Sequence, residues 1–423
     1  MSSDQILVLC YLSAWVITFL VYWRRTKNFN GGAFVMSTYI VYALCSFLLY
    51  GTTYIYFNPL PLKVFPFIYL YIALLLGLLP ILKFGTNGYS ELQVPSMRLL
   101  NTISIIFIFS TLLDLPSTIS NVSEGMSRML VDSAAGNEMY TESIDNVHSS
   151  GAGITNIGAI ISNAFAQIGY LLTIYYLTLS NKNKWIFWGL LAACLTKIAH
   201  AVSLGQRGGI VEPLLILAAT SFLLKDYMIE KYRRMLYVAG AVLVVLIMVP
   251  VVLITLSRFD NKATDPMSSI YYYLGIENIN FNNYALDDGG LRYGDRTIPL
   301  FKRMLGFDNV PRNFFERRAK YPNLKVNDET FITYIGDIAI DYGPIVGALI
   351  IIMMSLFFLN KTYARGNIVP FHKLLLLHFL LYMCVIGGIK LFPYADGGNL
   401  KIIICIILYF TFKSDYIKQN KYQ

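Results

Sequence analysis

The sequence predicts an all-α, polytopic integral membrane protein, and three observations support this fold class. Hydrophobic residues make up 56% of the 423 residues and charged residues only 14%, with a mean hydropathy of +0.54. About eleven apolar segments have roughly the 17–25 residues that an α-helix needs to cross a bilayer. Lys and Arg gather in the loops on one side of these segments. A soluble domain of this length needs no such apolar excess, so part of the protein surface is expected to face lipid instead of water.

The predicted spans cover most of the chain, and residues 1–423 are expected to form a single membrane domain. The first apolar segment starts at Gln5 and Ile6 without a basic n-region or a small-residue cleavage site, so we expect it to be retained as a helix. The apolar segments begin near residues 5, 33, 64, 99, 152, 185, 208, 236, 333, 368 and 398.

The short loops on one side of the predicted bundle are basic, and this side is expected to be cytoplasmic. Lys and Arg are disfavoured in short translocated loops and accumulate in the cytoplasm. With eleven spans, the N-terminus is then outside and the C-terminus is cytoplasmic. The basic residues concerned are Arg24, Arg25, Lys27, Lys83, Arg98, Lys182, Lys184, Lys225, Lys231, Arg233, Arg234, Lys361, Arg365, Lys413, Lys418 and Lys421.

Several functional classes are not expected. The sequence contains no Walker-type phosphate loop, HExxH motif or paired CxxC motif, and its four histidines are widely spaced, which argues against ATP-driven transport and zinc chemistry. The five cysteines fall within apolar spans, where they are expected to be small core residues. The net charge of +9 suits an anionic membrane surface, whereas no basic and aromatic pattern indicates nucleic acid. Membrane lipid is therefore an expected partner, and nucleic acid is not.

Two long external loops are predicted, at residues 114–151 and 258–332. Long loops are usually functional or disordered. The first is acidic, with an amphipathic helix at 120–132, and is expected to be either a solvated cap or a lid that contacts sugars. The second carries eleven Lys or Arg residues, ten Asp or Glu residues and many aromatic residues. This composition favours either a sugar-binding groove or a folded loop with its own small core, with 299–307 as an amphipathic helix on the membrane.

A basic stretch, LTKIAHAVSLGQRGGIVEPLL (195–215), lies between the sixth and seventh predicted spans. Lys197, His200 and Arg207 are spaced to share a helical face near the outer end of the sixth span. The glycines of GQRGG allow a tight reversal, and the helix that follows has free N–H groups. An arginine there can contact phosphate oxygens with two N–H groups, as in a polyprenyl pyrophosphate. The alternative is a snorkelling lysine, a core histidine and an interfacial arginine.

An acidic segment, ETFITYIGDIAIDYGPIVGALI (329–350), opens the ninth predicted span. Glu329, Asp337 and Asp341 precede or enter the outer leaflet, and the last two lie four residues apart on one helical face. They are expected either to pair with external arginines or Lys197, or to supply a general base whose pKa is raised by partial burial.

Two further pairs lie near this segment in the predicted topology. Gly343 and Gly347 are expected to form a small-residue surface that lets helices approach closely. Lys390 and Asp396 flank the outer end of the tenth span and are expected to complete the same cavity.

With these features the chain resembles the Wzy-type family of bacterial O-antigen and capsule repeat-unit polymerases. The resemblance covers nearly the whole length: about eleven spans, the turn SLGQRGG (203–209), a large basic external loop before a late helix, and TFITYIGDIAIDYGPIVGAL (330–349). It implies a GT-C-like arrangement and a metal-independent inverting glycosyltransferase that needs no cofactor. Such an enzyme transfers a glycan between undecaprenyl pyrophosphate carriers at the outer face of the cytoplasmic membrane, in lipopolysaccharide, capsule or exopolysaccharide synthesis, with a flippase and a chain-length regulator as partners.

The resemblance also implies roles for individual residues. Arg207 matches the family's arginine in the central external turn, and one arginine of the large loop is expected to be a second phosphate ligand. Related ligases carry a His-Asn pair before the late helix, but this chain has VNDETF (326–331) there, so Glu329 or Asp337 is expected to be the catalytic base. The residues expected to bind pyrophosphate are Arg207, Lys197, His200, Arg292, Arg296, Arg317 and Arg318.

Three alternatives to polymerase activity remain open at this point. An O-antigen ligase uses the same chemistry on a different acceptor, although the missing histidine and the large second loop argue against it. A flippase or transporter usually shows internal repeats and a polar path across the membrane, and the sequence shows neither. A purely structural partner of an export complex predicts that the outer arginines are replaceable.

Overall fold

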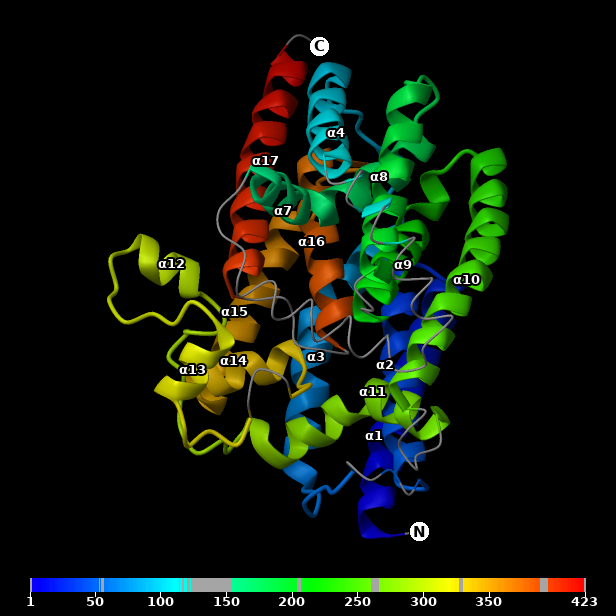
Figure 1. The fold of residues 1–423 in the computed structure, drawn as a ribbon. Helices are drawn as coiled ribbons and strands as arrows, with labels where there is room; N and C mark the ends of the chain where they lie inside the picture. The colour runs from blue at the N-terminus through cyan, green and yellow to red at the C-terminus, as the bar shows by residue number, and fades with distance from the viewer. Residues whose placement is uncertain are drawn as a thin grey trace. The chain divides into compact units, whose positions relative to one another are not determined.

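The computed structural model describes residues 2–52, 54, 57–113, 115, 118–119, 122, 154–203, 207–259, 266–326, 330–388 and 395–421. These residues are mainly helical (Figure 1). The helices are α1 (Ser3–Thr26), α2 (Gly31–Leu49), α3 (Val64–Thr86), α4 (Met97–Leu112), α7 (Ile154–Tyr175), α8 (Lys184–Ser203), α9 (Arg207–Leu224), α10 (Glu230–Phe259), α11 (Pro266–Asn280), α12 (Pro299–Met304), α13 (Phe314–Lys320), α14 (Tyr334–Tyr342), α15 (Pro344–Thr362), α16 (Phe371–Gly387) and α17 (Ala395–Lys421). The shorter elements are β1 (Glu91–Leu92), β2 (Ile368–Val369), the 3-10 turns η1 (Tyr176–Thr178) and η2 (Lys225–Tyr227), and the π-helical turn η3 (Phe281–Ala285).

Seven of the described helices are long and apolar enough to cross a membrane, which confirms the predicted class of all-α polytopic membrane protein. They are Ser3–Thr26, Gly31–Leu49, Val64–Thr86, Gly158–Thr178, Lys184–Val202, Gly208–Tyr227 and Pro344–Thr362. Two more apolar helices, Met97–Leu112 and Phe371–Gly387, are shorter. A helix begins close to each of the eleven predicted positions, but the count of eleven spans stays a prediction.

Side-chain caps fix several helix starts. Ser2 and Gln5 form a reciprocal capping box at α1, and the Asn30 side chain accepts hydrogen bonds from two backbone N–H groups of α2. Thr333 accepts a hydrogen bond from the Gly336 N–H at the start of α14. Each cap satisfies N–H groups that have no partner within the helix.

The ninth predicted span is two helices rather than one. The predicted helix from residue 333 ends at Tyr342, and α15 begins at Pro344. Gly343 between them has φ +84°, a conformation that favours glycine, and a proline suits the first position of a helix. A Cβ on Gly347 would lie 3.2 Å from the Ala339 Cα, so this glycine lets α14 pack against α15. Asp337 therefore lies on a short helix before the span.

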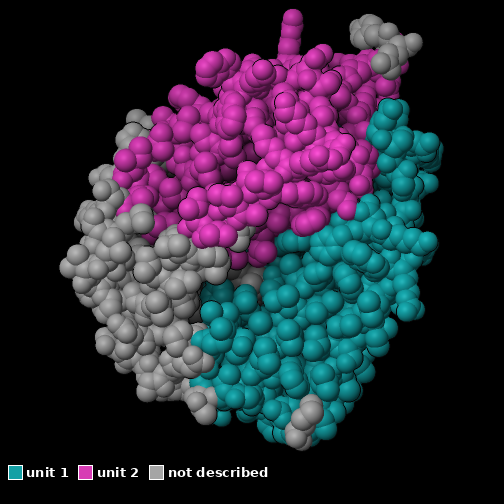
Figure 2. Space-filling model, turned by 90° about the vertical axis from the view of Figure 1, so that its right-hand side faces the viewer, with its two compact units in different colours: residues 1–91, 267–414 teal, residues 92–266, 415–423 magenta. Residues whose placement is uncertain are grey.

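The chain divides into two compact units, residues 1–91 with 267–414 and residues 92–266 with 415–423 (Figure 2). In the first unit α1 packs against α2, and α3 packs against α15 and α16. Aromatic side chains fill its interior; the buried Trp15 ring contacts the rings of Tyr39 and Tyr71. The Tyr39 hydroxyl donates to the Cys384 carbonyl at 2.9 Å, which joins α2 to α16.

Within the first unit, the starts of α1, α3 and α15 lie at the same end. The Tyr69 hydroxyl of α3 donates to the Pro344 carbonyl at 2.7 Å, and the backbone N–H of Leu62 donates to the Asp4 carboxylate at 3.3 Å. Because α3 and α15 run in the same direction from this end, their last residues lie at the other end of the unit.

The other end of the first unit carries basic short loops, as predicted. Backbone N–H groups of Ser90 and Glu91 donate to the Asn367 carbonyl at 3.0 and 3.3 Å, which joins the chain after α3 to the chain after α15. Within this unit, the basic residues near these helix ends are Arg24, Arg25, Lys27, Lys83, Lys361 and Arg365.

The second unit is built around α4, α7, α8 and α9. Small residues allow close packing: a Cβ on Gly169 of α7 would overlap the Phe107 ring of α4. The Thr111 and Ser162 hydroxyls hydrogen-bond at 2.8 Å between the same two helices. An apolar cluster joins the end of α8 to the start of α9 through Ile198, Ala201, Val202 and Ile210.

Candidate functional site

The segment between α11 and α14 forms a buried ionic group with α14 itself, which we call the Arg292 cluster: Arg292 and Thr297 from the segment, and Asp337 and Asp341 from α14. The Arg292 guanidinium lies 3.1 Å from a carboxylate oxygen of Asp337 and 2.7 Å from one of Asp341, and all three side chains are at most 3% exposed. The two aspartates contact the same arginine because they lie four residues apart on α14. The structure thus shows the predicted pairing of these carboxylates with an arginine of the loop at 258–332.

Backbone and hydroxyl donors complete the Arg292 cluster. Asp341 Oδ2 accepts hydrogen bonds from the Thr297 N–H at 2.8 Å and from the Thr297 hydroxyl at 2.6 Å. The Tyr293 N–H donates to the Asp341 carbonyl at 2.8 Å. Asn399, in the first turns of α17, donates to the Thr297 carbonyl at 2.7 Å and accepts from the Leu300 N–H at 3.0 Å. The cluster therefore fixes α14, the start of α12 and the start of α17 to one another.

A second group, the Asp295 cluster, consists of Asp295, Lys302, Lys320 and Tyr321. The buried Asp295 carboxylate pairs with Lys302, and it accepts hydrogen bonds from Lys320 at 2.7 Å and from the Tyr321 hydroxyl at 2.8 Å. Burial alone would raise the pKa of Asp295, but the hydrogen bonds from Lys302, Lys320 and Tyr321 outweigh it and lower the pKa. This carboxylate is therefore ionised at neutral pH and holds α12 and α13 together.

Asp337 has the electrostatics of a proton acceptor in a buried position. Complete burial raises its pKa from 3.8 to about 6, although the nearby charges of Arg296 and Arg292 act in the opposite direction. Among the described residues, none donates a hydrogen bond to its Oδ2 atom. The side chain is 0% exposed, so a ligand can contact it only if the surrounding segment moves.

The other predicted arginines of this loop differ in exposure. Arg296 is partly exposed and lies near Asp337. Arg317 is buried and Arg318 is exposed, both on α13. The structure thus brings Arg292, Arg296 and Asp337 together in one region of the first unit.

An open groove of about 800 Å³ lies on the same segment, between the end of α12 and α13. Its volume is within the roughly 300–1,000 Å³ of small-molecule sites. Hydrogen bonds fix its walls: Lys320 donates to the Asn309 carbonyl at 2.6 Å, and Arg303 donates to the Pro311 carbonyl at 3.3 Å. The residues that line it are Arg303, Phe307, Asp308, Asn309, Val310, Pro311, Arg312, Glu316, Ala319 and Lys320.

The chemistry of this loop groove suits a polar ligand with some apolar surface. An aromatic ring, two carboxylates, an amide and three cationic groups line one concave surface. Carboxylates and cations can accept from and donate to hydroxyl groups, and the Phe307 ring can contact the apolar face of a sugar.

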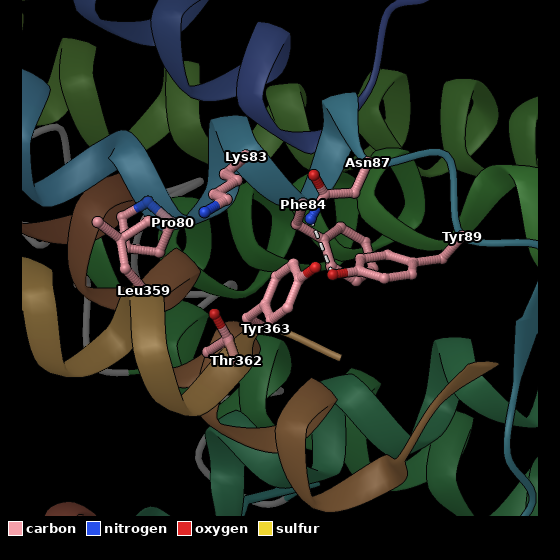
Figure 3. A pocket seen from close by; sticks show the side chains of 8 residues that line it. All are labelled: Pro80, Lys83, Phe84, Asn87, Tyr89, Leu359, Thr362 and Tyr363. Atoms are coloured by element: carbon pink, nitrogen blue, oxygen red, sulfur yellow. Dashed lines mark hydrogen bonds between the residues drawn. The ribbon is translucent and has the colours of Figure 1, made fainter. Parts of the chain in front are cut away.

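A second cavity, of about 10 Å³, lies among the last residues of α3 and α15 and the chain that follows them (Figure 3). Lys83 lies over the Tyr363 ring, 5.2 Å from its centre, and the Asn87 amide donates to the Tyr89 hydroxyl at 2.8 Å. The volume has room for about one water molecule. This cavity is therefore not a candidate for a glycan site.

Three predicted phosphate ligands lie in the second unit. The Lys197 ammonium donates to the Asn163 amide oxygen at 2.8 Å, from α8 to α7. His200 is exposed, with Nδ1 3.5 Å from the Thr118 hydroxyl. Arg207 is the first residue of α9, and its side chain lies outside the described part of the structure.

The helix α9 starts earlier than predicted, within the GQRGG sequence. Gly208 and Gly209 were expected to belong to the turn, but they lie in the first turn of α9. The helix starts earlier because glycine is tolerated in a first turn, whose N–H groups have no helical acceptor. Arg207 is therefore itself at the helix N-terminus.

Some predicted residues lie outside the described residues. Glu329 and Lys390 belong to the gaps at 327–329 and 389–394, and most of the acidic loop at 114–151 is also outside. Asp396, predicted to flank the outer end of the tenth span together with Lys390, pairs with Arg303.

Glu277 is a buried titratable group that the sequence reasoning did not single out. It is 0% exposed on α11, and complete burial raises its pKa well above the ordinary value. The neighbouring Asn278 donates to a Glu277 carboxylate oxygen at 3.3 Å and to the Ser46 hydroxyl at 3.0 Å, and accepts from the Tyr11 hydroxyl. A signal was present, because Glu277 is the single charged residue in the sequence of α11.

Within the described ranges, no group of three or more His, Cys, Asp or Glu side chains is placed to hold a metal ion. Comparison with known proteins adds no relative: no protein-family model matches the chain, and no curated protein or solved structure matches it.

Proposed function

We propose that this membrane protein is a polymerase of lipid-linked oligosaccharide repeat units. In this proposal it is a metal-independent inverting glycosyltransferase with a GT-C-like arrangement in a bacterial cytoplasmic membrane. It transfers a glycan from one undecaprenyl pyrophosphate carrier to a repeat unit on another, in O-antigen, capsule or exopolysaccharide synthesis. A flippase that supplies the repeat units and a chain-length regulator are its expected partners.

The observation that carries the proposal is the basic segment at 281–326 and its groove. Two buried acid–base clusters hold this segment at the end of the first unit where α1, α3 and α15 start. The groove of about 800 Å³ has the side chains that bind sugars. A membrane protein with a polar groove beside its spans is suited to a substrate with a lipid tail and a glycan head.

The proposed orientation places this segment outside. The short loops at the opposite end of the first unit are basic, and such loops stay in the cytoplasm. The N-terminus is then outside, the C-terminus is cytoplasmic, and the groove faces the compartment to which repeat units are exported.

In the proposed reaction, a hydroxyl group of the acceptor glycan attacks the anomeric carbon of the donor sugar. The new C–O bond forms as the bond to the pyrophosphate breaks, the pyrophosphate carrier leaves with the electron pair, and the anomeric configuration inverts. The hydroxyl proton passes to a carboxylate, for which Glu329 and Asp337 are the candidates. The donor is already activated, so the main tasks are orientation and stabilisation of the leaving charge.

Cationic side chains are assigned to the leaving pyrophosphate. Arg296, Arg317 and Arg318 of the loop are candidates, together with the residues of the second unit, Lys197, His200 and Arg207. Arg292 contacts two carboxylates, and we assign it to holding α14 in position. Arginine suits the ligand role because its planar guanidinium contacts two phosphate oxygens at once.

A glycan-length gel tests the proposal. The gene is deleted from its host and complemented with wild type, Arg207→Ala, Arg207→Lys or Arg296→Ala, with Arg365→Ala at the opposite end of the first unit as the matched control. We expect deletion to reduce the ladder to a single anchored repeat unit. Arg207→Ala is expected not to restore it, Arg207→Lys to restore it in part, and Arg365→Ala to restore it fully. Immunoblots of membranes confirm equal protein levels.

Two other outcomes of the gel would overturn the proposal. Loss of all anchored glycan with accumulation of carrier-linked polymer identifies a ligase. An unchanged ladder in the deletion strain excludes both glycosyltransferase activities and returns the arginines to structural roles.

A further inference from the structure

Three neighbouring apolar side chains project from the end of α12, and we call Met304, Leu305 and Phe307 the α12 tip. Their exposed fractions are 67%, 76% and 57%. Gly306, with φ +79°, turns the chain between them, and no atom lies within 4 Å of the Cβ position at this glycine. Apolar groups gathered on a surface in this way mark a site of interaction with a protein or a membrane.

The α12 tip is held in place from behind. Leu300 and Thr297 are hydrogen-bonded to Asn399 at 3.0 and 2.7 Å, and Arg303 pairs with Asp396, both in the first turns of α17. The Phe307 N–H donates to the Lys302 carbonyl at 3.1 Å and so closes the turn. The exposed side chains are thus fixed beside the point where α17 begins.

That point is where α17 enters its apolar stretch. The helix continues from Asn399 into LKIIICIILYF (400–410), and Ile407 and Phe410 are 52% and 60% exposed on its surface. Large exposed apolar side chains continue along α15 from Ile345 to Phe357. The tip therefore lies beside the start of the apolar stretch of α17, in its own unit.

The two basic side chains next to the α12 tip are paired, whereas the Asp308 carboxylate that follows Phe307 is exposed. Lys302 pairs with Asp295 and lies 5.9 Å from the centre of the Phe307 ring, and Arg303 pairs with Asp396. Moving paired charges into the headgroup region costs less than moving isolated ones, because their fields largely cancel. An apolar tip with paired basic residues behind it is the pattern of an interfacial membrane anchor.

We propose that the α12 tip inserts into the bilayer interface, in the same leaflet in which α17 starts. The occupant of this surface is lipid rather than a second protein, because three side chains are too few for a protein interface. Even at the roughly 150–250 Å² that a buried aromatic side chain contributes, three side chains fall short of the approximately 800 Å² per partner of a standard interface.

Insertion has a consequence for the loop groove. Arg303 and Phe307 belong both to this segment and to the lining of the groove, so insertion fixes the groove at the membrane surface and gives the Phe307 ring to lipid rather than to a sugar. The inference does not depend on the proposed glycosyltransferase activity, because it rests on exposure, anchoring and charge pairing alone.

Depth-dependent fluorescence quenching on the full chain tests the insertion. The exposed Cys10 is replaced by Ser, since the other four cysteines are buried, and Leu305→Cys is labelled with an NBD fluorophore. Asn323→Cys, exposed on the same extramembrane segment, is the aqueous control, and Phe410→Cys on α17 is the lipid-facing control. The proteins are reconstituted into vesicles of phosphatidylcholine and phosphatidylglycerol, with and without lipids that carry a spin label near the headgroup.

We expect the Leu305→Cys label to emit at shorter wavelength in vesicles and to be quenched by the spin-labelled lipid, whereas the Asn323→Cys label keeps a water-like spectrum. A water-like, unquenched label at residue 305 would overturn the proposal. A second result would also overturn the proposal: a blue-shifted label at residue 305 that spin-labelled lipid does not quench, and whose spectrum becomes water-like when the protein is diluted with lipid. That result identifies a second copy of the chain as the occupant. All three labelled positions are exposed, so the variants are expected to fold, and an unchanged gel-filtration profile checks this.

Discussion

Arg292 contacts two buried carboxylates, and truncating this one side chain would remove the guanidinium that both of them contact. The guanidinium lies 3.1 Å from Asp337 and 2.7 Å from Asp341, and its exposed fraction is 3%. Removing one partner of a buried ion pair typically lowers the free energy of unfolding by about 3–5 kcal/mol. We therefore predict that Arg292→Leu is destabilised by that order, measured by thermal or denaturant unfolding in detergent.

Two comparisons separate a structural role of Arg292 from a role in ligand binding. Arg318→Leu, on the exposed surface of α13, is expected to change the free energy of unfolding by less than about 0.5 kcal/mol. Combining Arg292→Leu with Asp337→Asn and Asp341→Asn should recover part of the loss, since no buried charge then lacks a partner. Wild-type stability of Arg292→Leu together with loss of the glycan ladder would contradict the structural role.

Asp337 makes stability depend on pH in a defined window. Its pKa is raised from 3.8 to about 6, so the folded state binds a proton more tightly than the unfolded state does. The resulting stabilisation is fully present below the unfolded value of 3.8 and is lost as the pH rises towards 6. We predict that Asp337→Asn reduces the change in unfolding free energy between these pH values, measured in parallel with wild type. Identical pH profiles for the two proteins would show that Asp337 does not titrate in this range.

Part of the Arg292 cluster was predictable from the sequence, and the rest was not. The spacing of Asp337 and Asp341 showed that they share a helical face, and their pairing with an external arginine was among the expectations. Which arginine pairs with them was not predictable, because Arg292 and Asp337 are 45 residues apart. Such a pairing depends on how the loop folds back on α14, and local periodicity carries no information about that.

At the scale of whole elements, α11 packs against α2 with almost no space between their backbones. A Cβ on Gly275 would overlap the backbone nitrogen of Ser46, and the Ser46 hydroxyl donates to the Gly275 carbonyl at 2.6 Å. We predict that Gly275→Ala displaces α11 and strongly lowers the unfolding temperature, since backbone atoms cannot move aside as a flexible side chain can.

The matched control for Gly275 is Gly240 on α10, where no atom lies within 4 Å of the Cβ position. Alanine is a better helix former than glycine by roughly 1 kcal/mol, so Gly240→Ala is expected to keep or raise the unfolding temperature. Equal effects of the two substitutions would contradict the close contact between α11 and α2.

Elements were easier to predict than their ends. Continuous apolar residues gave the positions of the main helices, but they also favoured one helix from residue 333, where the structure has two. The signal for the break was present as the dipeptide Gly343-Pro344, which combines free backbone dihedrals with a residue that lacks an N–H donor. The hydrophobicity of a segment indicates that it is buried in lipid or protein, but it does not show where one helix ends and the next begins.

At the scale of the whole molecule, composition was sufficient for the class of membrane protein but not for its division into two compact units. The second unit interrupts the first in sequence, between residues 92 and 266. Each apolar segment carries the same hydrophobic signal whichever helices it packs against, so the assignment of helices to units depends on contacts between distant segments.

Orientation is the property of the whole chain on which the proposed function depends. In the first unit, Asn367 lies at the end with basic short loops, and Asn323 lies on the segment at the opposite end. Because short basic loops remain in the cytoplasm, we predict that a membrane-impermeant maleimide labels Asn323→Cys in intact spheroplasts. Asn367→Cys should be labelled only after permeabilisation, with Cys10→Ser as the common background. The opposite pattern would place the groove in the cytoplasm, away from exported lipid-linked repeat units, and would contradict the proposed polymerase. Labelling of both positions before permeabilisation would contradict the assignment of these two ends to different compartments.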